Sequence, residues 1–156
     1  MVVSRTECAR RMRQFAERCR RAEMKITRQR TEVFRELAGT DEHPDAETVY
    51  WRVSRRIAAI SRDTVYRTLA TLEKQGLVRR AETYTGAARY DANTAQHHHF
   101  VCSRCGRVCD FSSDALNDLP IPKAAAALGT ITSAHVQVLG ICRACQGRKT
   151  RSGRAR

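Results

Sequence analysis

Two Cys-x-x-Cys pairs, separated by 36 residues, constrain this chain more than any other feature of its sequence. Cys102 and Cys105 form the first pair, which Gly106 follows, and Cys142 and Cys145 form the second. Four thiolates satisfy the tetrahedral coordination of Zn²⁺, and such a closed ligand shell is typical of structural sites. The spacing therefore predicts a zinc ion that joins two separate segments and contributes folding free energy. A redox-active dithiol and a pair of disulfides are the alternatives.

The other three cysteines do not suggest a disulfide framework, because the total of seven is odd. The Arg-rich N-terminus lacks the apolar segment of a secretory signal, and no apolar run approaches the roughly 20 residues of a membrane-spanning helix. We therefore expect a soluble protein of the cytoplasm, where thiols stay reduced. Cys8, Cys19 and Cys109 are expected to be small buried side chains, with metal or redox roles as the alternative.

The net charge of +13 is distributed unevenly along the 156 residues. Residues 1–90 hold 20 basic and 12 acidic side chains, residues 91–146 hold four of each, and residues 147–156 hold five basic ones. This distribution predicts two domains followed by a basic, disordered tail. A basic first domain favours polyanion binding, because contacts to phosphates release condensed counterions. A charged surface that only confers solubility is the alternative.

The spacing of apolar residues predicts four helices in the first 76 residues. The first covers about residues 6–22, and the second runs from Thr27 as N-cap to Ala38. The third begins after Asp45, and its apolar stripe extends to Ile57. The fourth lies between Ser61 as N-cap and Gly76 as stop signal.

The fourth helix carries polar side chains opposite its apolar face, as a helix in the major groove of DNA does. Two short strand-like runs follow over residues 77–90, with a turn expected at Thr85-Gly86. Helices followed by a basic hairpin predict a winged helix-turn-helix. A solvated helix face is the alternative. The residues expected to contact DNA are Arg28, Arg62, Thr64, Tyr66, Arg67, Thr71 and Lys74.

The second domain begins with a run of three histidines that reads as a strand over residues 97–102. On a strand, His97 and His99 share one face, so that both imidazoles can reach one ion, while His98 points the other way. A short helix is expected over residues 124–128 and a strand over residues 131–141. A domain of about 55 residues has a thin core, which favours pairing with a second copy.

These features predict an α+β fold with three parts. An N-terminal winged helix-turn-helix covers residues 1–90 including the hinge, and a small α/β dimerisation domain covers residues 91–146. The tail covers residues 147–156. A homodimer would place two recognition helices on half-sites of double-stranded DNA about one helical turn, or a multiple of it, apart. No His-Glu-x-x-His, deaminase His-x-Glu or Gly-rich phosphate loop is present in the sequence, so we expect no enzymatic activity.

Several short motifs occur together in an order typical of one family. They are Thr27-Arg28-Gln29-Arg30, His43-Pro44-x-Ala46 with Tyr50, Ser61 with Thr64-Val65-Tyr66-Arg67-x-Leu69 and Leu72, Arg89-Tyr90-Asp91, His97-x-His99, Cys102-x-x-Cys105-Gly106 and Gly140-x-Cys142-x-x-Cys145. On these residues the chain resembles the ferric uptake regulator (Fur) superfamily of metal-dependent repressors, from about residue 27 to residue 145.

The resemblance implies a regulatory metal site at the hinge between the two domains, besides the structural zinc. Carried over by position, its ligands are His43, Asp91, His97, His99 and Asp110. Five nitrogen and oxygen donors without a thiolate suit Fe(II) or Mn(II) better than zinc. Because His43 belongs to the first domain, the ion would fix the relative orientation of the domains and thereby control DNA affinity.

The two aspartates, Asp91 and Asp110, resemble the peroxide-sensing (PerR) branch, since iron sensors tend to carry glutamate there. Many iron and zinc sensors also have a histidine at the position of Ala134, whereas His135 is expected on the opposite face of its strand. The resemblance implies that peroxide oxidises His43 and His97 when Fe(II) is bound, and that DNA is then released. The alternatives are an iron- or zinc-responsive repressor of metal uptake and a zinc-stabilised structural protein that binds nucleic acid.

Overall fold

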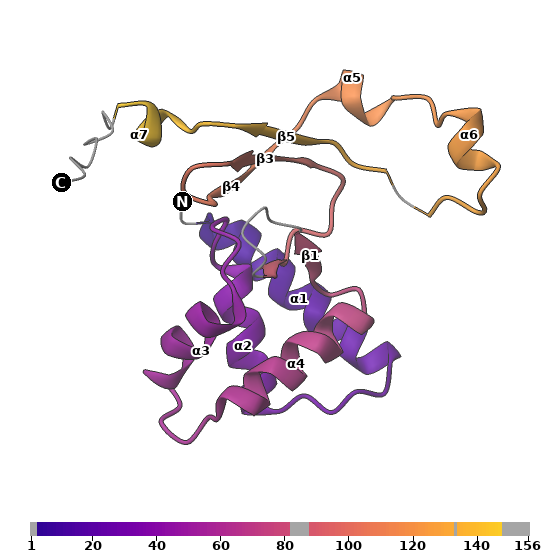
Figure 1. The fold of residues 1–156 in the computed structure, drawn as a ribbon. Helices are drawn as coiled ribbons and strands as arrows, with labels where there is room; N and C mark the ends of the chain where they lie inside the picture. The colour runs from indigo at the N-terminus through magenta and orange to yellow at the C-terminus, as the bar shows by residue number, and fades with distance from the viewer. Residues whose placement is uncertain (1–2, 82–87, 133, 148–156) are drawn as a thin grey trace. The chain divides into compact units, whose positions relative to one another are not determined.

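The computed structural model describes residues 3–81, 88–132 and 134–147. The chain divides into two compact units, Met1–Ala95 and Gln96–Arg156, which we call the N-terminal and C-terminal units. The first is mainly helical and the second contains a small sheet, so that the predicted α+β class is confirmed (Figure 1). Among the described residues, no helix combines the length and apolarity needed to cross a bilayer.

Four helices build most of the N-terminal unit. Their bounds are α1 Arg5–Arg21, α2 Arg28–Ala38, α3 Ala46–Ser54 and α4 Arg62–Lys74. Each begins after a residue whose side-chain oxygen accepts a hydrogen bond from the backbone N–H three positions later, and these N-caps are Ser4, Thr27, Asp45 and Ser61. The three N-caps that the sequence predicted are thereby confirmed.

The end of α4 also follows from local chemistry. Gly76 has a φ of +63°, which glycine adopts without steric cost, and the N–H of Leu77 donates to the carbonyl of Leu72. Helix α3 is shorter than its apolar stripe predicted. Ile57 lies beyond its last residue but still packs, partly buried, against the core.

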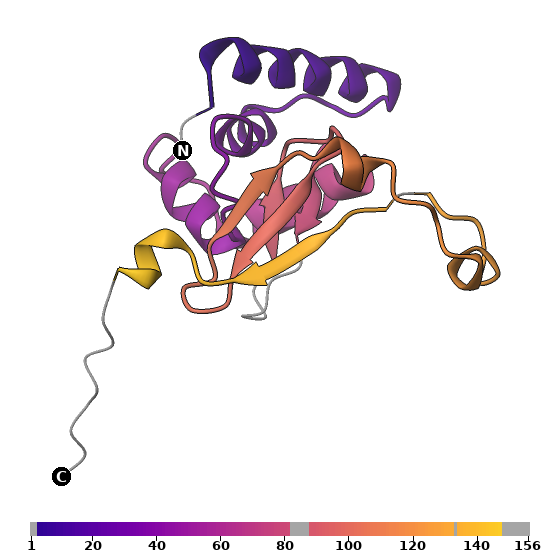
Figure 2. The same ribbon diagram turned by 90° about the horizontal axis from the view of Figure 1, so that it is seen from above.

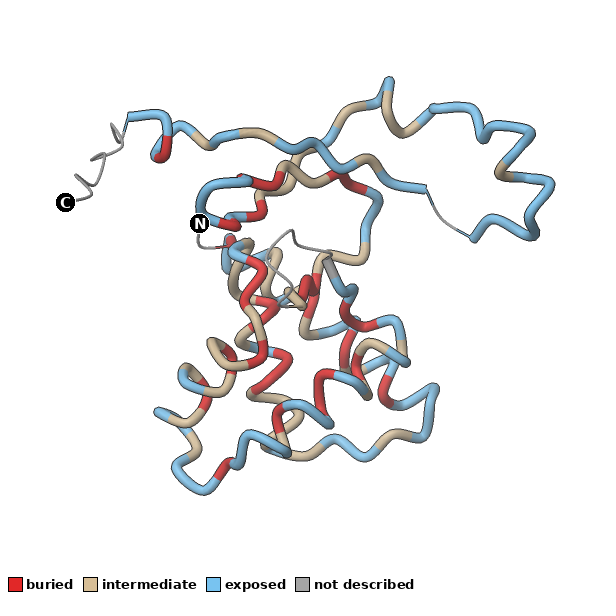
Figure 3. The backbone as a smooth tube through the Cα atoms, viewed as in Figure 1, coloured by how far each residue is buried: buried red, intermediate tan, exposed pale blue. Residues whose placement is uncertain are grey.

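The apolar faces of the four helices form one core, and Figure 3 marks the buried residues along these helices in red. The rings of Phe15 in α1 and Phe34 in α2 stack with their centroids 4.7 Å apart. Val49, Leu69 and other aliphatic side chains of α3 and α4 are fully buried beside them. Cys19 is also fully buried, as the sequence predicted.

A two-stranded antiparallel sheet completes the N-terminal unit. Its strands are β1, Arg79–Ala81, and β2, Arg89–Asp91, with Arg79 opposite Asp91. A bridge between Asp45 and Arg89 joins β2 to the start of α3. The paired strands β1 and β2 come after α4 in the chain, as the predicted winged helix-turn-helix requires. The expected turn at Thr85-Gly86 lies outside the described residues. Residues 148–156 of the expected tail also lie outside them.

The C-terminal unit contains a three-stranded sheet in the order β4-β3-β5 (Figure 2). Its strands are β3 His98–Cys102, β4 Val108–Phe111 and β5 Gln137–Gly140, and β3 is antiparallel to β4 but parallel to β5. Three short helices accompany the sheet: α5 Asp114–Asn117, α6 Lys123–Ala126 and α7 Arg143–Gln146.

The strand predicted over residues 131–141 is much shorter in the structure. Only Gln137–Gly140 is extended as β5, and the described residues from 131 to 136 lie outside any strand. The reason is the length of the partner strand. Because β3 begins at His98 and pairs His99 with Gln137, little of β3 remains to pair with residues before 137.

Candidate metal centres and DNA-facing helix

Two loops at one end of the β3–β5 pair bring four cysteines together, and we call these four the cysteine cluster. Cys102 ends β3, and Cys105 lies in the turn after it. Cys142 caps α7, and Cys145 lies within that helix. Pairing of Cys102 with Gly140 places the first Cys-x-x-Cys pair beside the second, although 36 residues separate them.

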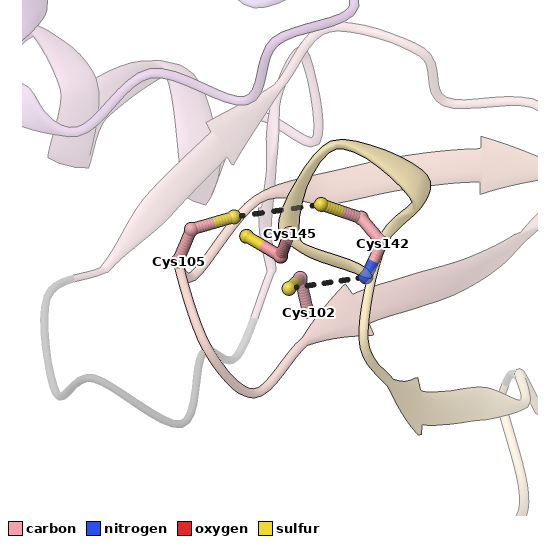
Figure 4. Close-up of side chains that lie close together, drawn as sticks. All are labelled: Cys102, Cys105, Cys142 and Cys145. Carbon is pink, nitrogen blue, oxygen red and sulfur yellow. Dashed lines mark hydrogen bonds between the residues drawn. The ribbon is translucent and has the colours of Figure 1, made fainter. Parts of the chain in front are cut away.

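The geometry of the cysteine cluster fits a tetrahedral ion (Figure 4). All four Sγ atoms lie within 4.8 Å of one another, and those of Cys105 and Cys142 are 3.8 Å apart. Zn–S bonds of about 2.3 Å in a tetrahedron separate the sulfur atoms by about 3.8 Å, whereas a disulfide needs about 2.05 Å. All seven cysteines are free thiols, so the arrangement favours zinc over disulfides.

The electrostatics of the cluster also favour a cation. The backbone N–H of Cys142 donates to Sγ of Cys102 at 3.3 Å, and this hydrogen bond lowers the pKa of Cys102 to about 6. Hydrogen bonds with the neighbouring thiols, first that of Cys105, raise the pKa of Cys145 to about 12. Four sulfur atoms this close cannot all carry negative charge unless a cation compensates them.

In the N-terminal unit, His43 and Asp91 form a second candidate site, which we call the His-Asp pair. Both residues are buried, with 1% and 4% exposure, and Nε2 of His43 lies 3.7 Å from Oδ2 of Asp91. The Nδ1 atom of His43 lies 3.1 Å from the carbonyl oxygen of Asp41, to which Nδ1–H donates. That hydrogen bond directs the Nε2 lone pair toward Asp91, as in many metal-bound histidines.

The backbone of His43 has an unusual conformation. Its φ is +49°, in the left-handed region that costs a non-glycine residue about 1–2 kcal/mol. Tertiary contacts hold this conformation, because the guanidinium of Arg89 donates to the carbonyl of His43 and the N–H of Tyr90 donates to the carbonyl of Pro44. Such strain often occurs at functional sites.

In the C-terminal unit, His97, His99 and Asp110 form a third group, which we call the histidine cluster. The Nε2 atoms of His97 and His99 are 2.9 Å apart, and Oδ1 of Asp110 lies 3.7 and 3.5 Å from them. The register of β3 with β4 sets this arrangement, because it places His99 opposite Asp110. Two nitrogens bound at a right angle to one ion, each at about 2.1 Å, are about 3.0 Å apart.

The structure confirms the prediction for the faces of β3. His98 is fully buried, away from the histidine cluster, and its Nδ1 accepts the N–H of Val136 at 3.2 Å. His135 lies outside β5, so the strand from which its orientation was predicted does not include it. Its ring lies 6.4 Å from that of His99, centroid to centroid, because β5 starts at Gln137 and strand alternation does not extend to residue 135.

The residues predicted to contact DNA differ in exposure. Arg28 at the start of α2 is exposed, and so are four side chains of α4, those of Arg62, Tyr66, Arg67 and Lys74. Thr64 and Thr71 are half-buried. The hydroxyl of Thr71 donates to the carbonyl of Arg67 at 2.8 Å, so the hydrogen bond of this hydroxyl is made within α4.

Sequence reasoning missed a cluster of side chains around Arg62, the first residue of α4. The guanidinium of Arg62 lies 4.5 Å from the ring centroid of Tyr50 and 5.3 Å from that of Trp51, and it also donates to Glu47 at 3.1 Å. Trp51 is 58% exposed. The adjacent Tyr50-Trp51 pair was a usable signal, but only tertiary packing joins it to α4.

A winged helix-turn-helix combined with thiolate and imidazole–carboxylate clusters defines the class of metal-responsive transcriptional regulators. The ferric uptake regulator family model matches residues 21–138 of the chain. The chain belongs to the ferric uptake regulator family. It is therefore a metal-responsive transcriptional regulator and not an enzyme.

Individual relatives agree with this membership. The peroxide-responsive repressor PerR of Staphylococcus aureus is 30% identical over 127 residues, which are 81% of this chain and 86% of the relative. The Helicobacter pylori ferric uptake regulator Fur has the same fold, with a TM-score of 0.71 at 20% identity over 92% of this chain and 96% of that one. A zinc uptake regulator complexed with zinc and DNA has a TM-score of 0.65 at 26% identity, over 89% of this chain and 95% of that one.

Proposed function

We propose that this chain is a cytoplasmic, metal-dependent repressor that binds operator DNA as a homodimer and is released by peroxide. In this proposal the cysteine cluster binds structural zinc. The regulatory ion, Fe(II) or Mn(II), is bound jointly by the His-Asp pair and the histidine cluster. The ligands of the regulatory ion would be His43, Asp91, His97, His99 and Asp110.

The observation that carries the proposal is that each unit contains part of one suitable donor set. The His-Asp pair offers one nitrogen and one oxygen donor, and the histidine cluster offers two nitrogens and one oxygen. Neither set alone completes the coordination that Fe(II) or Mn(II) prefers, whereas together they supply five donors of the right type. Only five residues separate Asp91 from His97, which is a short link between the two sets.

The DNA-binding part of the proposal assigns residues 1–90 to operator recognition. Exposed cationic and hydroxyl side chains of α4 are donors that base edges and phosphates in the major groove accept. Arg62 has the best-defined orientation among them, because Tyr50, Trp51 and Glu47 fix its guanidinium. A fixed side chain loses less entropy when it binds.

The dimer part assigns residues 91–146 to self-association. In the C-terminal unit, Val138, Leu139 and Ile141 are 41–50% exposed although they are apolar. These residues belong to or follow β5, which is an edge strand of the sheet, and an exposed apolar edge is suited to pairing with another chain. A second copy would cover it.

The peroxide part rests on the aspartates at positions 91 and 110 and on the PerR relative. Bound Fe(II) would supply the activation of hydrogen peroxide. One oxygen atom of peroxide would then be inserted into a ring C–H bond of His43 or His97, the other would leave as water, and the oxidised imidazole would be a poorer ligand. The regulatory metal site would lose a nitrogen donor, and DNA affinity would fall. Mn(II) would support repression without this oxidation.

Mass spectrometry after Fe(II) loading and peroxide treatment tests the proposal. We expect a gain of one oxygen on a peptide that contains His43 or His97, together with loss of operator binding, and neither change with Mn(II). Unmodified histidines, with operator release that depends only on free metal, would reject peroxide sensing. His43→Ala is the companion variant. Unchanged, metal-independent operator binding by it would favour the zinc-stabilised structural protein.

An iron- or zinc-responsive repressor of metal uptake is the second candidate function. The observation that favours it is the ring of His135, which lies near His99 and places a third imidazole beside the two of the histidine cluster. A donor set richer in imidazole suits zinc better than the five proposed ligands do. Metal titrations that follow operator binding separate these candidates, because only a peroxide sensor loses binding irreversibly when Fe(II) and peroxide are present together.

A further inference from the structure

A buried arginine in α1 has no role in the sites described so far. Arg11 is 4% exposed, and its Nε donates to Oε1 of Glu7 at 2.9 Å. Its Nη2 donates to Oδ1 of Asp41 at 3.4 Å, and its Nη1 is buried without a hydrogen-bond partner among the residues that the structure describes. A buried charge with an unpaired N–H is costly, and an apolar side chain often stabilises such a position equally well. Stability alone therefore does not explain Arg11.

Asp41, the second partner of Arg11, is also hydrogen-bonded to His43 of the His-Asp pair. Asp41 receives the Arg11 guanidinium on its side chain, and its backbone carbonyl accepts the Nδ1–H of His43 at 3.1 Å. A single residue thus links α1 to the ring of His43. Because the Arg11 guanidinium anchors the side chain of Asp41, it helps to fix the position of the carbonyl that accepts the imidazole N–H.

The contacts around His43 make this link effective. The carbonyl of His43 is held on the other side by Arg89, and its φ of +49° is maintained only by its surroundings. The ring is therefore oriented by Asp41 through Nδ1, and the backbone is held by Arg89. Outer partners of this kind set the tautomer and direction of a ligand histidine and are often worth 10- to 100-fold in metal affinity.

We infer that Arg11 is a positioning residue for the metal ligand His43, acting through Asp41. This inference rests on the proposed function, in which His43 binds the regulatory ion. It adds a dependence of metal affinity on α1, which contributes no ligand of its own. Lysine would not replace Arg11, because only the guanidinium fork reaches Glu7 and Asp41 together.

The test compares two neighbouring arginines in the full-length, zinc-loaded protein. Arg10 also forms hydrogen bonds to Glu7, two of 2.7 Å, but among the described residues it makes no hydrogen bond or ion pair with Asp41. Titration with Mn(II) should show about 10-fold weaker binding for Arg11→Met and less than about 2-fold change for Arg10→Met. Arg11→Lys should resemble Arg11→Met. With Co(II) as a spectroscopic probe, Arg11→Met should change the ligand-field absorption of the regulatory site, which a general loss of stability would not do.

A second variant keeps the test valid if Arg11→Met does not fold. Asp41→Asn removes the charge that Arg11 binds and retains the backbone carbonyl, and the Asp41 side chain is 34% exposed. It should weaken Mn(II) binding as Arg11→Met does, and the double variant should be no weaker than either single one. Equal Mn(II) affinity of Arg11→Met, Asp41→Asn and Arg10→Met would overturn the inference.

His43→Ala distinguishes this failure from failure of the proposed function. If His43→Ala abolishes Mn(II) binding while the Arg11 and Asp41 variants bind normally, the regulatory site stands and the positioning role is rejected. If His43→Ala itself binds Mn(II) as tightly as the unmodified protein, His43 is not a ligand. The proposed function then fails, and the inference fails with it.

Discussion

The two units of this chain are stabilised in different ways. The N-terminal unit has a continuous apolar core contributed by all four helices, and each of these helices has a capping side chain. In the C-terminal unit, the described buried apolar side chains are few: Val101, Cys102, Val108 and Cys145. Two of them are zinc ligands in our proposal, and several large aliphatic side chains of this unit are exposed. We therefore expect the first unit to fold on its own hydrophobic core, and the second to depend on a metal ion and a partner.

Loss of zinc should give the largest loss of stability, and this loss should be confined to the C-terminal unit. Cys142→Ser removes one ligand of the cysteine cluster, and structural zinc contributes about 10 kcal/mol or more in small zinc domains. We expect hydrogen exchange of the β3 and β5 amides to become fast, while the amides of α1–α4 keep their protection. Exchange followed by mass spectrometry, together with zinc content, measures this.

Cys109→Ser is the matched control for that experiment. Cys109 is half-buried in β4 of the same unit and lies outside the cysteine cluster. Its substitution should leave the zinc content and the protection of β3 unchanged. If zinc-free protein retained slow exchange in β3, the C-terminal unit would have enough core of its own, and the contrast between the units would be wrong.

Two leucines test the same contrast at an intermediate magnitude. Leu69 in α4 is fully buried, so Leu69→Ala should reduce the free energy of unfolding of the N-terminal unit by about 2–5 kcal/mol. Leu139 in β5 is 50% exposed, so Leu139→Ala should reduce the free energy of unfolding of a subunit by about 0.5 kcal/mol or less. The same substitution should weaken association of the dimer. Denaturant unfolding measures the first effect, and sedimentation against concentration measures the second. A large loss of subunit stability with unchanged association for Leu139→Ala would contradict the proposed interface.

The sequence predicted best what local chemistry determines. The N-caps Thr27, Asp45 and Ser61 and the opposite faces of His97 and His98 follow from rules that involve a few neighbouring residues. The proximity of the two Cys-x-x-Cys pairs was also predictable, because coordination of one zinc ion by four thiolates requires the two pairs to meet.

Features that depend on contacts between distant segments were not predictable. Arg11 and Asp41 are 30 positions apart, and nothing in either neighbourhood indicates that they meet. The position of His135 depends on where β5 begins, which is set by the length of β3 and not by the residues around 135. The left-handed backbone of His43 likewise results from its tertiary contacts, since neither its residue type nor the following proline requires it.

Loss of a helix cap should give a small change in the free energy of unfolding, and this change should still differ between the two units. Ser61 accepts the N–H of Thr64 at 3.1 Å, whereas Ser113, which precedes α5 in the C-terminal unit, makes no side-chain capping hydrogen bond. Ser61→Ala should therefore reduce the free energy of unfolding by about 1 kcal/mol, and Ser61→Gly by only a few tenths. Ser113→Ala should be neutral within the error of denaturant unfolding. An equal loss from both serines would mean that residue type, and not the hydrogen bond, determines the effect, and the N-terminal unit would then owe less to its capped helices than the structure indicates.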